Sequence, residues 1–336
     1  MEYAPVIIPT LNRVRHLKRC IDSLSRCTDA DKTELYISID FPPSDNYKEG
    51  YKKVVDLILS YDFSSFKNHH IFFQKKNLGA VHNFRFLLGV VTKVSDIVIV
   101  TEDDNEFSPN FLCYMNQCLD SFRNDEDVIA ICGVNEADYI PEKGSNVIKA
   151  KLMPVYGIGY WIKKINAFQK EGADFLMDPK SWSIRNFIKL YIRNPFIFSI
   201  YVNSVIATDK GMFWLPDGEL VFCDTIYSLY MHISKYTCIV PCLSKSRTFG
   251  NDGSGVNMPA RDDNGMQEID MEKIYELKYN RIINYNSHNF KKSRNYLKTG
   301  YLSKSVLHAI ILLLFLFLSG KNRKFLISFN HKFIRC

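Results

Sequence analysis

The cysteines of this chain lack the spacing of a zinc site and of a disulfide framework. Nine are scattered over 336 residues, and no two of them form a Cys-x-x-Cys pair. Structural zinc needs closely paired ligands, and a disulfide framework needs an even set of partners. The odd number and the absence of a secretory signal predict a cytoplasmic protein. Because a strand is expected to begin near Tyr3, we expect no N-terminal targeting segment.

The chain also lacks an apolar run of the length that spans a membrane. The run VLHAIILLLFLFL covers positions 306–318. As a helix it would measure ~20 Å, against ~30 Å for the bilayer core. Basic and aromatic residues alternate after it. We therefore expect an interfacial segment that holds the chain on an anionic membrane surface, peripheral to the inner face of the membrane.

Acidic residues are missing from the end of the chain. From residue 281 on there are eleven Lys and Arg and no Asp or Glu, which leaves 32 basic against 36 acidic residues before that point. We assign residues 1–260 to a catalytic domain and residues 261–336 to a basic helical tail. A buried helix, an oligomer interface and a true transmembrane segment stay open for the apolar run. A run of Leu and Phe suits phosphate poorly, so we expect no nucleic-acid partner.

The remaining composition, 46% hydrophobic and 24% charged, is that of a globular protein without internal repeats. Strand-like and helix-like patterns alternate over positions 1–135. Strands are predicted at residues 4–8, 34–39, 70–73, 97–100 and 128–132. Such alternation is typical of an α/β sheet of mainly parallel order. Apolar residues recur between the strands at helical spacing, and they are Leu17, Cys20, Ile21, Leu24, Tyr51, Val54, Val55 and Ile58.

The middle of the chain, residues 136–260, is less regular. It has many aromatic residues, a glycine pair at Gly157 and Gly159, and the loop GNDGSG at residues 250–255. We expect this region to cover a cleft and not to extend the sheet.

The segment IVIVTEDDNEFSPNF carries the most chemical information. Four β-branched residues at 97–100 predict a strand buried on both faces, and a helix is expected over residues 109–122 with Ser108 as its N-cap. Glu102, Asp103 and Asp104 lie between them, at the carboxyl end of the strand, where open α/β sheets bind ligands. Three adjacent acids repel one another unless a hard cation or ligand hydroxyls compensate them. The pattern predicts a metal-assisted site, with a solvated acidic turn as the alternative.

A second carboxylate, Asp40, is expected at the same edge. It follows the strand at residues 34–39, which Pro42 and Pro43 bring to an end. A reaction in which a diphosphate leaves a sugar needs a divalent cation for the charge that gathers on the leaving group. It also needs a general base for the attacking hydroxyl, placed on a different segment. Carboxylates suit Mn²⁺ or Mg²⁺ as the cofactor.

Several motifs, taken in order, resemble glycosyltransferases of the A fold. They are APVIIPTLNR, the strand end ISID, the turn NLGAVHNF and the acidic triplet before a Ser-Pro-Asn-Phe helix start. The triplet and the segment SKSRTFGNDGSG at residues 244–255 resemble more narrowly the N-acetylglucosaminyltransferase I family. The likeness covers residues 4–260. It implies a nucleotide-sugar-binding, Rossmann-like mixed sheet flanked by helices, as also found in bacterial family 2-like sugar transferases.

The resemblance implies roles for individual residues. Asp104 would hold the metal, Glu102 and Asp103 would face hydroxyls of the donor sugar and ribose, and Asp40 would bind the nucleotide base. The family has its base in a Trp-Asp-Asp-Trp element before the late segment. This chain has Phe-Cys-Asp-Thr there, with Asp224 in place but without the tryptophans or the second aspartate. We predict Asp224 as the catalytic base, and Asp217, Glu219 and Asp252 stay open as substitutes.

Further residues are candidates for donor binding. Pro9 and Thr10 end the first strand, and Asn77, Gly79 and Asn83 match the turn that seats a nucleotide-sugar. Arg13 can meet a phosphate beside helix amides, or be an exposed arginine. Arg247 can steady the diphosphate or pair with an acid. Trp161 can stack on a sugar ring, although a place in the core is favoured.

The sequence thus predicts a metal-dependent, inverting glycosyltransferase. It would move a sugar from a nucleotide-sugar to a hydroxyl of a glycan or lipid-linked acceptor in bacterial surface polysaccharide assembly. A UDP-sugar is the favoured donor. Inversion is implied by the resemblance alone. One alternative is a non-catalytic nucleotide-sugar or membrane-interaction protein with a decayed site. The other is a nucleotidyltransferase, which would favour a glycine-rich, lysine-bearing loop where this chain has PTLNRVRH.

Overall fold

The structure is a computed structural model, and it describes only part of the chain. The described residues are 2–135, 144–151, 153–177, 227, 230, 231, 233–250, 252–254, 268–279, 284, 285, 310 and 314. By its internal contacts the chain divides into a first unit, residues 1–167 and 237–284, and a second unit, residues 168–236 and 285–336. The site described below lies in the first unit. The domain boundary at residue 260 stays a prediction.

The five predicted strands are all present. The observed elements are, in chain order, β1 (Val6–Thr10), α1 (Val14–Ser25), η1 (Ala30–Lys32), β2 (Glu34–Ile39), η2 (Asp45–Tyr47), α2 (Lys48–Ser60), β3 (Asn68–Phe73), α3 (Ala80–Val91), β4 (Ile97–Val100), β5 (Asn105–Phe107), α4 (Phe111–Ser121), β6 (Val128–Cys132), β7 (Val147–Ala150), β8 (Ile158–Trp161), α5 (Ile162–Met177), β9 (Thr237–Pro241), β10 (Ser246–Thr248) and β11 (Asn284–Tyr285). The strands β2, β4 and β6 have the predicted limits. The strand β1 is shifted by two residues toward the acidic rim.

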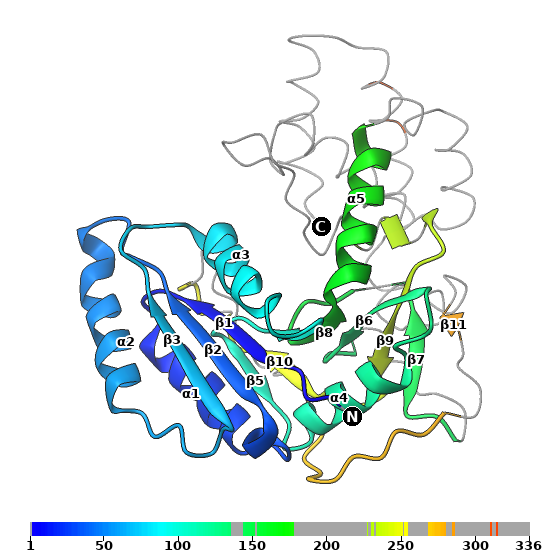
Figure 1. Cartoon of the computed structure of the whole chain (residues 1–336), viewed down its shortest axis with the longest axis horizontal. Coiled ribbons are helices and arrows are strands. Elements are labelled where there is room, and N and C mark those ends of the chain that lie inside the picture. Colours follow the sequence, from blue (N-terminus) through cyan, green and yellow to red (C-terminus); the bar gives the residue numbers. More distant parts are fainter. Residues whose placement is uncertain are drawn as a thin grey trace. The chain divides into compact units, whose positions relative to one another are not determined.

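The described strands form a mixed sheet in the order β11-β7-β9-β6-β8-β4-β1-β2-β3 (Figure 1). The strands β4, β1, β2 and β3 are parallel to one another. The strand β8 is antiparallel to both β4 and β6 and joins the two halves of the sheet. Because β1, β2 and β4 are parallel, their carboxyl ends meet at one edge. The predicted α/β class with a mixed sheet flanked by helices is confirmed.

The prediction for the middle of the chain is wrong in part, because β7, β8 and β9 extend the sheet. All residues of β8 and β9 are buried. Gly159 allows α4 to pack closely on β8. The Leu119 and Met115 side chains of α4 lie against the Gly159 backbone, where a Cβ would be tightly packed. Trp161 at the end of β8 is only 4% exposed and belongs to the hydrophobic core. The preferred expectation for this tryptophan is confirmed.

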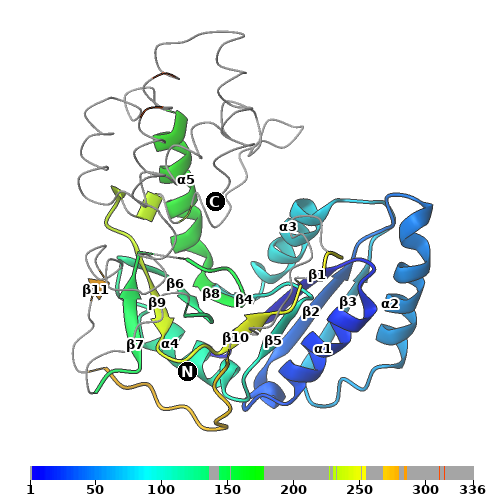
Figure 2. The ribbon, with the colours of Figure 1, turned by 180° about the vertical axis from the view of Figure 1, so that it is seen from behind.

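Helices cover both faces of the sheet near the site. Val6 and Ile8 of β1 belong to one core cluster with side chains of α1, α2 and α4. Ile7 is equally buried but points to the opposite face, as strand geometry requires. The helix α3 contacts β1 and β2 on that face (Figure 2). The apolar stripe predicted for α1 is confirmed, since all four of its residues are fully buried.

The predicted N-cap of α4 is wrong by two residues. The helix begins at Phe111, and Asn110 is the N-cap residue. Ser108 lies before it, where its backbone N–H donates to the carbonyl of Lys245 at 2.8 Å. The Ser108 hydroxyl also bonds to Asn110 Oδ1 at 3.0 Å. A long-range contact with the β9–β10 connection therefore holds Ser108 outside the helix.

Residues 268–279 pack against α4 in the first unit. Leu277 donates its backbone N–H to Gln117 Oε1 at 2.9 Å. Asp270 forms an ion pair with Lys245, which is only 3% exposed, and accepts a hydrogen bond from Asn110 Nδ2 at 3.0 Å. The Lys245 ammonium also lies 4.8 Å from the centroid of the Tyr275 ring. One buried ion pair thus joins this segment, the start of α4 and the β9–β10 connection.

In the parts of the chain that the structure describes, no helix has both the length and the apolarity to cross a membrane. The apolar segment at 306–318 lies outside the described residues except for Ile310 and Leu314.

Replacing Asp270 by Asn should lower the free energy of unfolding by about 3–5 kcal/mol, because it leaves the buried Lys245 ammonium without a counter-charge. Urea unfolding followed by circular dichroism measures this. The matched control is Lys278→Gln, which breaks an exposed pair with Glu276 and should cost at most about 1 kcal/mol. Equal losses in the two variants would contradict the assigned role of Asp270.

Candidate functional site

The acidic triplet lies directly after β4, at the carboxyl edge of the sheet. Glu102 is exposed, whereas Asp103 and Asp104 are 4% and 8% exposed. Two neighbouring carboxylates at this depth are costly unless positive charge or hydrogen-bond donors compensate them. The compensation comes from β1 and from the start of α1.

Thr10 and Arg13 compensate the two buried carboxylates. The Thr10 hydroxyl donates to Asp103 Oδ2 at 2.7 Å. One guanidinium nitrogen of Arg13 donates to Asp104 Oδ2 at 2.9 Å, and the other donates to Asp103 Oδ1. Burial lowers the pKa of Arg13, but the attraction of the two carboxylates outweighs it, so the pKa is raised. Burial raises the pKa of Asp103 even though Arg13 and Thr10 favour its charged form.

The late Ser-Arg-Thr-Phe-Gly segment lies beside the triplet. The strand β10 pairs with β5 in antiparallel register, with Ser246 opposite Phe107 and Thr248 opposite Asn105 (Figure 1). Beyond the pair, the backbone N–H of Phe249 donates to the Asp104 carbonyl at 2.9 Å. The two motifs that carried the resemblance lie far apart in the sequence, and in the structure they form one site.

Gly250 covers the Asp104 carboxylate with bare backbone. A Cβ at this position would overlap Asp104 Oδ2. Only glycine allows the loop to come this close. The loop and Arg13 therefore enclose one oxygen of the carboxylate.

The other oxygen, Asp104 Oδ1, is buried and has no hydrogen-bond partner among the described residues. An orphaned carboxylate oxygen is costly, and it is the kind of ligand that Mn²⁺ and Mg²⁺ prefer. The described residues contain no cluster of three or more His, Cys, Asp or Glu that would hold a metal by themselves. Asp104 Oδ1 suits a metal as a single carboxylate ligand, and donor phosphates and water would have to complete the coordination.

Around this centre lie Arg247, which was predicted, and four charged or aromatic side chains that were not predicted from the sequence, namely His16, Arg19, Glu106 and Phe249. Glu106 Oε2 accepts hydrogen bonds from Arg19 at 2.6 Å and from Arg247 Nε at 2.7 Å. The ring of Phe249 stacks on His16 at 5.2 Å and lies 4.3 Å from the Arg19 guanidinium carbon. The signal was present, since Arg13 directly precedes α1, and His16 and Arg19 follow on that helix three residues apart.

Burial raises the pKa of Glu106, but the hydrogen bonds and charges of Arg19 and Arg247 outweigh it and leave the pKa below its ordinary value. Arg247, predicted either to steady the diphosphate or to pair with an acid, pairs with Glu106 in the structure.

Asp252 also joins this group, since its Oδ2 lies 3.2 Å from His16 Nε2. Its Oδ1 accepts hydrogen bonds from the backbone and hydroxyl of Ser254 at 3.0 and 2.6 Å. The Ser254 hydrogen bonds lower the pKa of Asp252. The predicted base Asp224, and the substitutes Asp217 and Glu219, lie outside the described residues.

Asp40 directly follows β2 and is 4% exposed. Its carboxylate accepts four hydrogen bonds, from the backbone N–H groups of Phe41, Leu78 and Gly79 at 2.8–2.9 Å and from Asn77 Nδ2 at 3.1 Å. These bonds tie the turn before α3 to the end of β2. To bind a nucleotide base, as predicted, Asp40 would have to exchange one of them.

Asn83 is buried and links three elements, since its side-chain amide accepts a hydrogen bond from the Ser38 hydroxyl at 2.5 Å and donates to the Ser38 and Thr10 carbonyls. Pro9 lies half-buried in β1. The structure therefore places the predicted donor-binding residues Thr10, Arg13 and Asp103 at one point, and gives Asp40 and Asn83 supporting contacts nearby.

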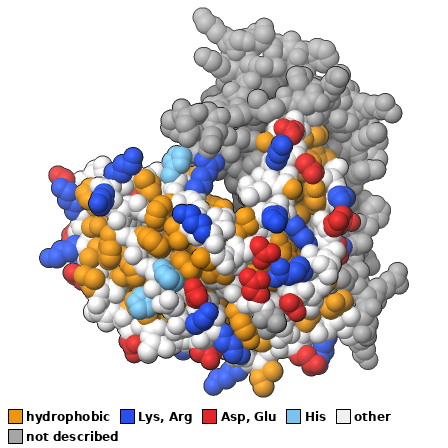
Figure 3. All heavy atoms as spheres, viewed as in Figure 1, with side chains coloured by type: hydrophobic (Ala, Val, Ile, Leu, Met, Phe, Trp, Pro, Cys, Tyr) orange, Lys and Arg blue, Asp and Glu red, His pale blue; other side chains and the backbone are white. Residues whose placement is uncertain are grey.

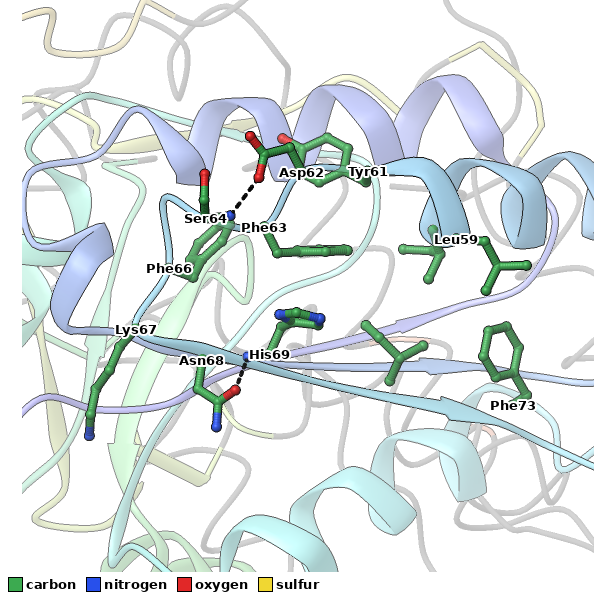
Figure 4. A pocket seen from close by; sticks show the side chains of 12 residues that line it. Leu59, Tyr61, Asp62, Phe63, Ser64, Phe66, Lys67, Asn68, His69 and Phe73 are labelled. Atoms are coloured by element: carbon green, nitrogen blue, oxygen red, sulfur yellow. Dashed lines mark hydrogen bonds between the residues drawn. The ribbon is translucent and has the colours of Figure 1, made fainter.

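A separate groove of about 500 Å³ lies between the end of α2, the following loop and β3 (Figure 4). Tyr61, Phe63 and His69 line it with stacked and tilted rings. Apolar side chains gather on this face of the molecule (Figure 3). Two residues that line the groove, Leu59 of α2 and Phe73 of β3, are 72% and 42% exposed. No member of the acidic triplet lines this groove, so it does not belong to the site.

Comparison with known proteins gives one match of sequence. The model of glycosyl transferase family 2 matches residues 6–190, more than half of the chain. No curated protein matches. The family match and the mixed sheet confirm the glycosyltransferase A fold. They do not show the narrower resemblance to the N-acetylglucosaminyltransferase I family, so the residue roles carried over from it stay predictions.

Solved structures give distant similarities. The mannosyltransferase of Pyrobaculum calidifontis in complex with GDP-Man and Mn²⁺ is 12% identical with a TM-score of 0.37, over 69% of this chain and 70% of that one. Residues 1–349 of TarS from S. aureus in complex with UDP are 16% identical with a TM-score of 0.34, over 50% and 48%. Mouse xyloside xylosyltransferase 1 is 10% identical with a TM-score of 0.36, over 69% and 82%.

Replacing Glu106 by Gln should lower the free energy of unfolding at pH 7 by about 1–3 kcal/mol, since it removes the charge that Arg19 and Arg247 share. The folded pKa of Glu106 lies below its ordinary value of 4.5. The contribution of the Glu106 charge to the free energy of unfolding is therefore fully present above the ordinary pKa of 4.5. It is lost as the pH falls through the lower pKa of the folded state.

Urea unfolding of the wild type and of Glu106→Gln between pH 7 and pH 3 measures this, and the two curves should converge at the acidic end. Glu276→Gln, at an exposed pair, is the matched control and should track the wild type at all pH values. A difference between Glu106→Gln and the wild type that stays constant with pH would show that the charge of Glu106 is not what stabilises the site.

Proposed function

The chain belongs to glycosyl transferase family 2, and we propose that it is a metal-dependent, inverting enzyme that transfers a sugar from a UDP-sugar to a hydroxyl of a glycan or lipid-linked acceptor. The observation that carries the proposal is the orphaned, buried oxygen Asp104 Oδ1 at the carboxyl edge of the sheet. It lies where open α/β sheets bind ligands and where the predicted metal carboxylate belongs.

The same edge offers positive groups for a donor diphosphate. Arg13 is the residue that precedes α1, and the first N–H groups of this 12-residue helix have no partner within the helix. Helix N-termini bind phosphate groups, and a guanidinium can grip two phosphate oxygens at once. Arg247 and Arg19 lie close by on Glu106. These residues would bind and orient the donor.

Asp104 would hold Mn²⁺ or Mg²⁺, which when bound offsets the negative charge that gathers on the leaving diphosphate. Glu102 and Asp103 would face hydroxyls of the donor sugar and ribose. Thr10 keeps Asp103 in place through its 2.7 Å hydrogen bond.

The proposed base is Asp224. It would take the proton of the acceptor hydroxyl while the oxygen forms a bond to the anomeric carbon, and the bond from that carbon to the diphosphate oxygen breaks on the opposite face. Asp252, the one of the three substitutes that lies among the described residues, is paired with His16 and Ser254. It would need to leave these partners before it could act as the base.

Two further parts of the proposal concern the surroundings of the enzyme. The basic tail at 261–336, with its apolar segment at 306–318, would hold the enzyme on the cytoplasmic face of an anionic membrane, where lipid-linked acceptors are reached. Bacterial surface polysaccharide assembly suits this arrangement. The alternative function is a non-catalytic protein that binds nucleotide-sugars through a decayed site, and turnover separates the two.

Replacing Asp104 by Ala should abolish metal-dependent transfer, because it removes the proposed metal ligand. We expect UDP to bind with Mn²⁺ and much more weakly without it, as measured by calorimetry against UDP, GDP, CDP and TDP.

Asp224→Asn should keep this Mn²⁺-dependent binding of UDP but lower the rate of transfer by a factor of about 10² or more. Asp62→Ala, far from the triplet in the groove near β3, is the control and should change neither.

Full transfer activity in Asp224→Asn would remove Asp224 as the base. Unaltered Mn²⁺-dependent binding in Asp104→Ala would remove the metal site. Binding of a nucleotide-sugar without turnover in the wild type, across acceptors with free sugar hydroxyls, would favour the non-catalytic alternative.

The membrane proposal predicts that the full chain sediments with vesicles of anionic lipid and not with neutral vesicles. Replacing Lys321, Arg323 and Lys324 together by Gln should weaken binding by a factor of about 10² or more, since each basic residue near the surface contributes about 1 kcal/mol. Three exposed lysines of the body, Lys48, Lys53 and Lys67, serve as the control set. Equal loss in both sets would contradict an anchor in the tail.

A further inference from the structure

We propose that Arg13 is an internal counter-cation for the metal site, which leaves the triplet when a divalent ion binds and moves to the donor diphosphate. The inference rests on the proposed function and adds a role for one residue of this chain. It predicts that metal and donor bind far more tightly together than alone, and that Arg13 is the cause.

The contacts of Arg13 support the first half of the proposal. Its guanidinium donates to Asp103 and Asp104 at once, and its side chain is 18% exposed. The two carboxyl side chains are 5% and 11% exposed. This is the place and the charge that a metal ion would otherwise supply. The buried acids are therefore stable without a metal because Arg13 stands in for it.

The charges show why the two cations compete. Asp103 has hydrogen bonds to both of its oxygens, from Thr10 and from Arg13. Asp104 has Arg13 on Oδ2 and no described partner on Oδ1. A divalent ion on Oδ1 would share the Asp104 carboxylate with the Arg13 guanidinium on Oδ2. Two cations on one carboxylate repel each other strongly in a buried site. Metal binding should weaken the hold of the triplet on Arg13.

The place of Arg13 in the chain supports the second half. It precedes the first residue of α1, so its side chain starts from the helix end where a phosphate binds best. A donor diphosphate brings at least two negative charges to this point. The guanidinium then exchanges two carboxylate oxygens for two phosphate oxygens, and its fork geometry is retained.

A manganese titration followed by electron paramagnetic resonance tests the proposal, because the signal of free Mn²⁺ reports binding without any turnover. In the absence of nucleotide, Arg13→Gln should bind Mn²⁺ at least tenfold more tightly than the wild type. At saturating Mn²⁺ the same variant should bind UDP at least tenfold more weakly, as measured by calorimetry. The two opposite changes in one variant are the signature of an exchanged cation.

Arg15→Gln is the matched control, since Arg15 has the same side chain and lies exposed two residues further along the chain, in the first turn of α1. It should bind both Mn²⁺ and UDP as the wild type does. Arg13→Lys keeps the charge but loses the fork, so its Mn²⁺ affinity should lie between those of Arg13→Gln and the wild type. It also serves as the test if thermal unfolding shows that Arg13→Gln is not folded.

Asp104→Asn separates a failure of this inference from a failure of the proposed function. If Asp104→Asn abolishes Mn²⁺ binding while Arg13→Gln binds Mn²⁺ no more tightly than the wild type, Arg13 is a fixed structural partner and the inference is overturned alone. If Asp104→Asn binds Mn²⁺ as well as the wild type does, the metal site of the proposed function falls, and this inference falls with it.

Discussion

The site depends on the compensation of two buried carboxylates. Asp103 and Asp104 follow a buried strand, and the chain places both side chains in the interior although carboxyl groups are costly to bury. Thr10 and Arg13 hold three of the four oxygens. Water cannot take their place at this depth without loss of stability. The fourth oxygen, Asp104 Oδ1, has no partner among the described residues, and the proposed metal chemistry rests on this one position.

The parallel half of the sheet brings these groups together. The strands β1, β2 and β4 end at the same edge, so side chains from distant parts of the chain, such as Arg13 and Asp103, meet there. The antiparallel pair of β5 and β10 then adds a loop from the far end of the catalytic region. Gly250 lets that loop lie on Asp104. The carboxyl end of β4 carries the acids, and the backbone that follows the β5–β10 pair covers Asp104.

Local patterns predicted the local part of this structure. The β-branched run of β4 and the helical spacing of α1 are properties of short segments, and both were confirmed. Long-range contacts decided the rest. The antiparallel insertion of β8 and the shift of the α4 N-cap away from Ser108 depend on partners that lie far away in the sequence, and no local pattern encodes them.

The acidic triplet was found from sequence because repulsion among adjacent acids is itself local. The bonds of Glu106 to Arg19 and Arg247 were missed because they join three separate segments.

The most direct test of the account is to locate the metal. A crystal grown with UDP and Mn²⁺, measured at the manganese absorption edge, gives an anomalous peak at the ion itself. We expect one peak within bonding distance of a carboxylate oxygen of Asp104. A peak beside other residues, or bound UDP without any peak at Asp104, would contradict it.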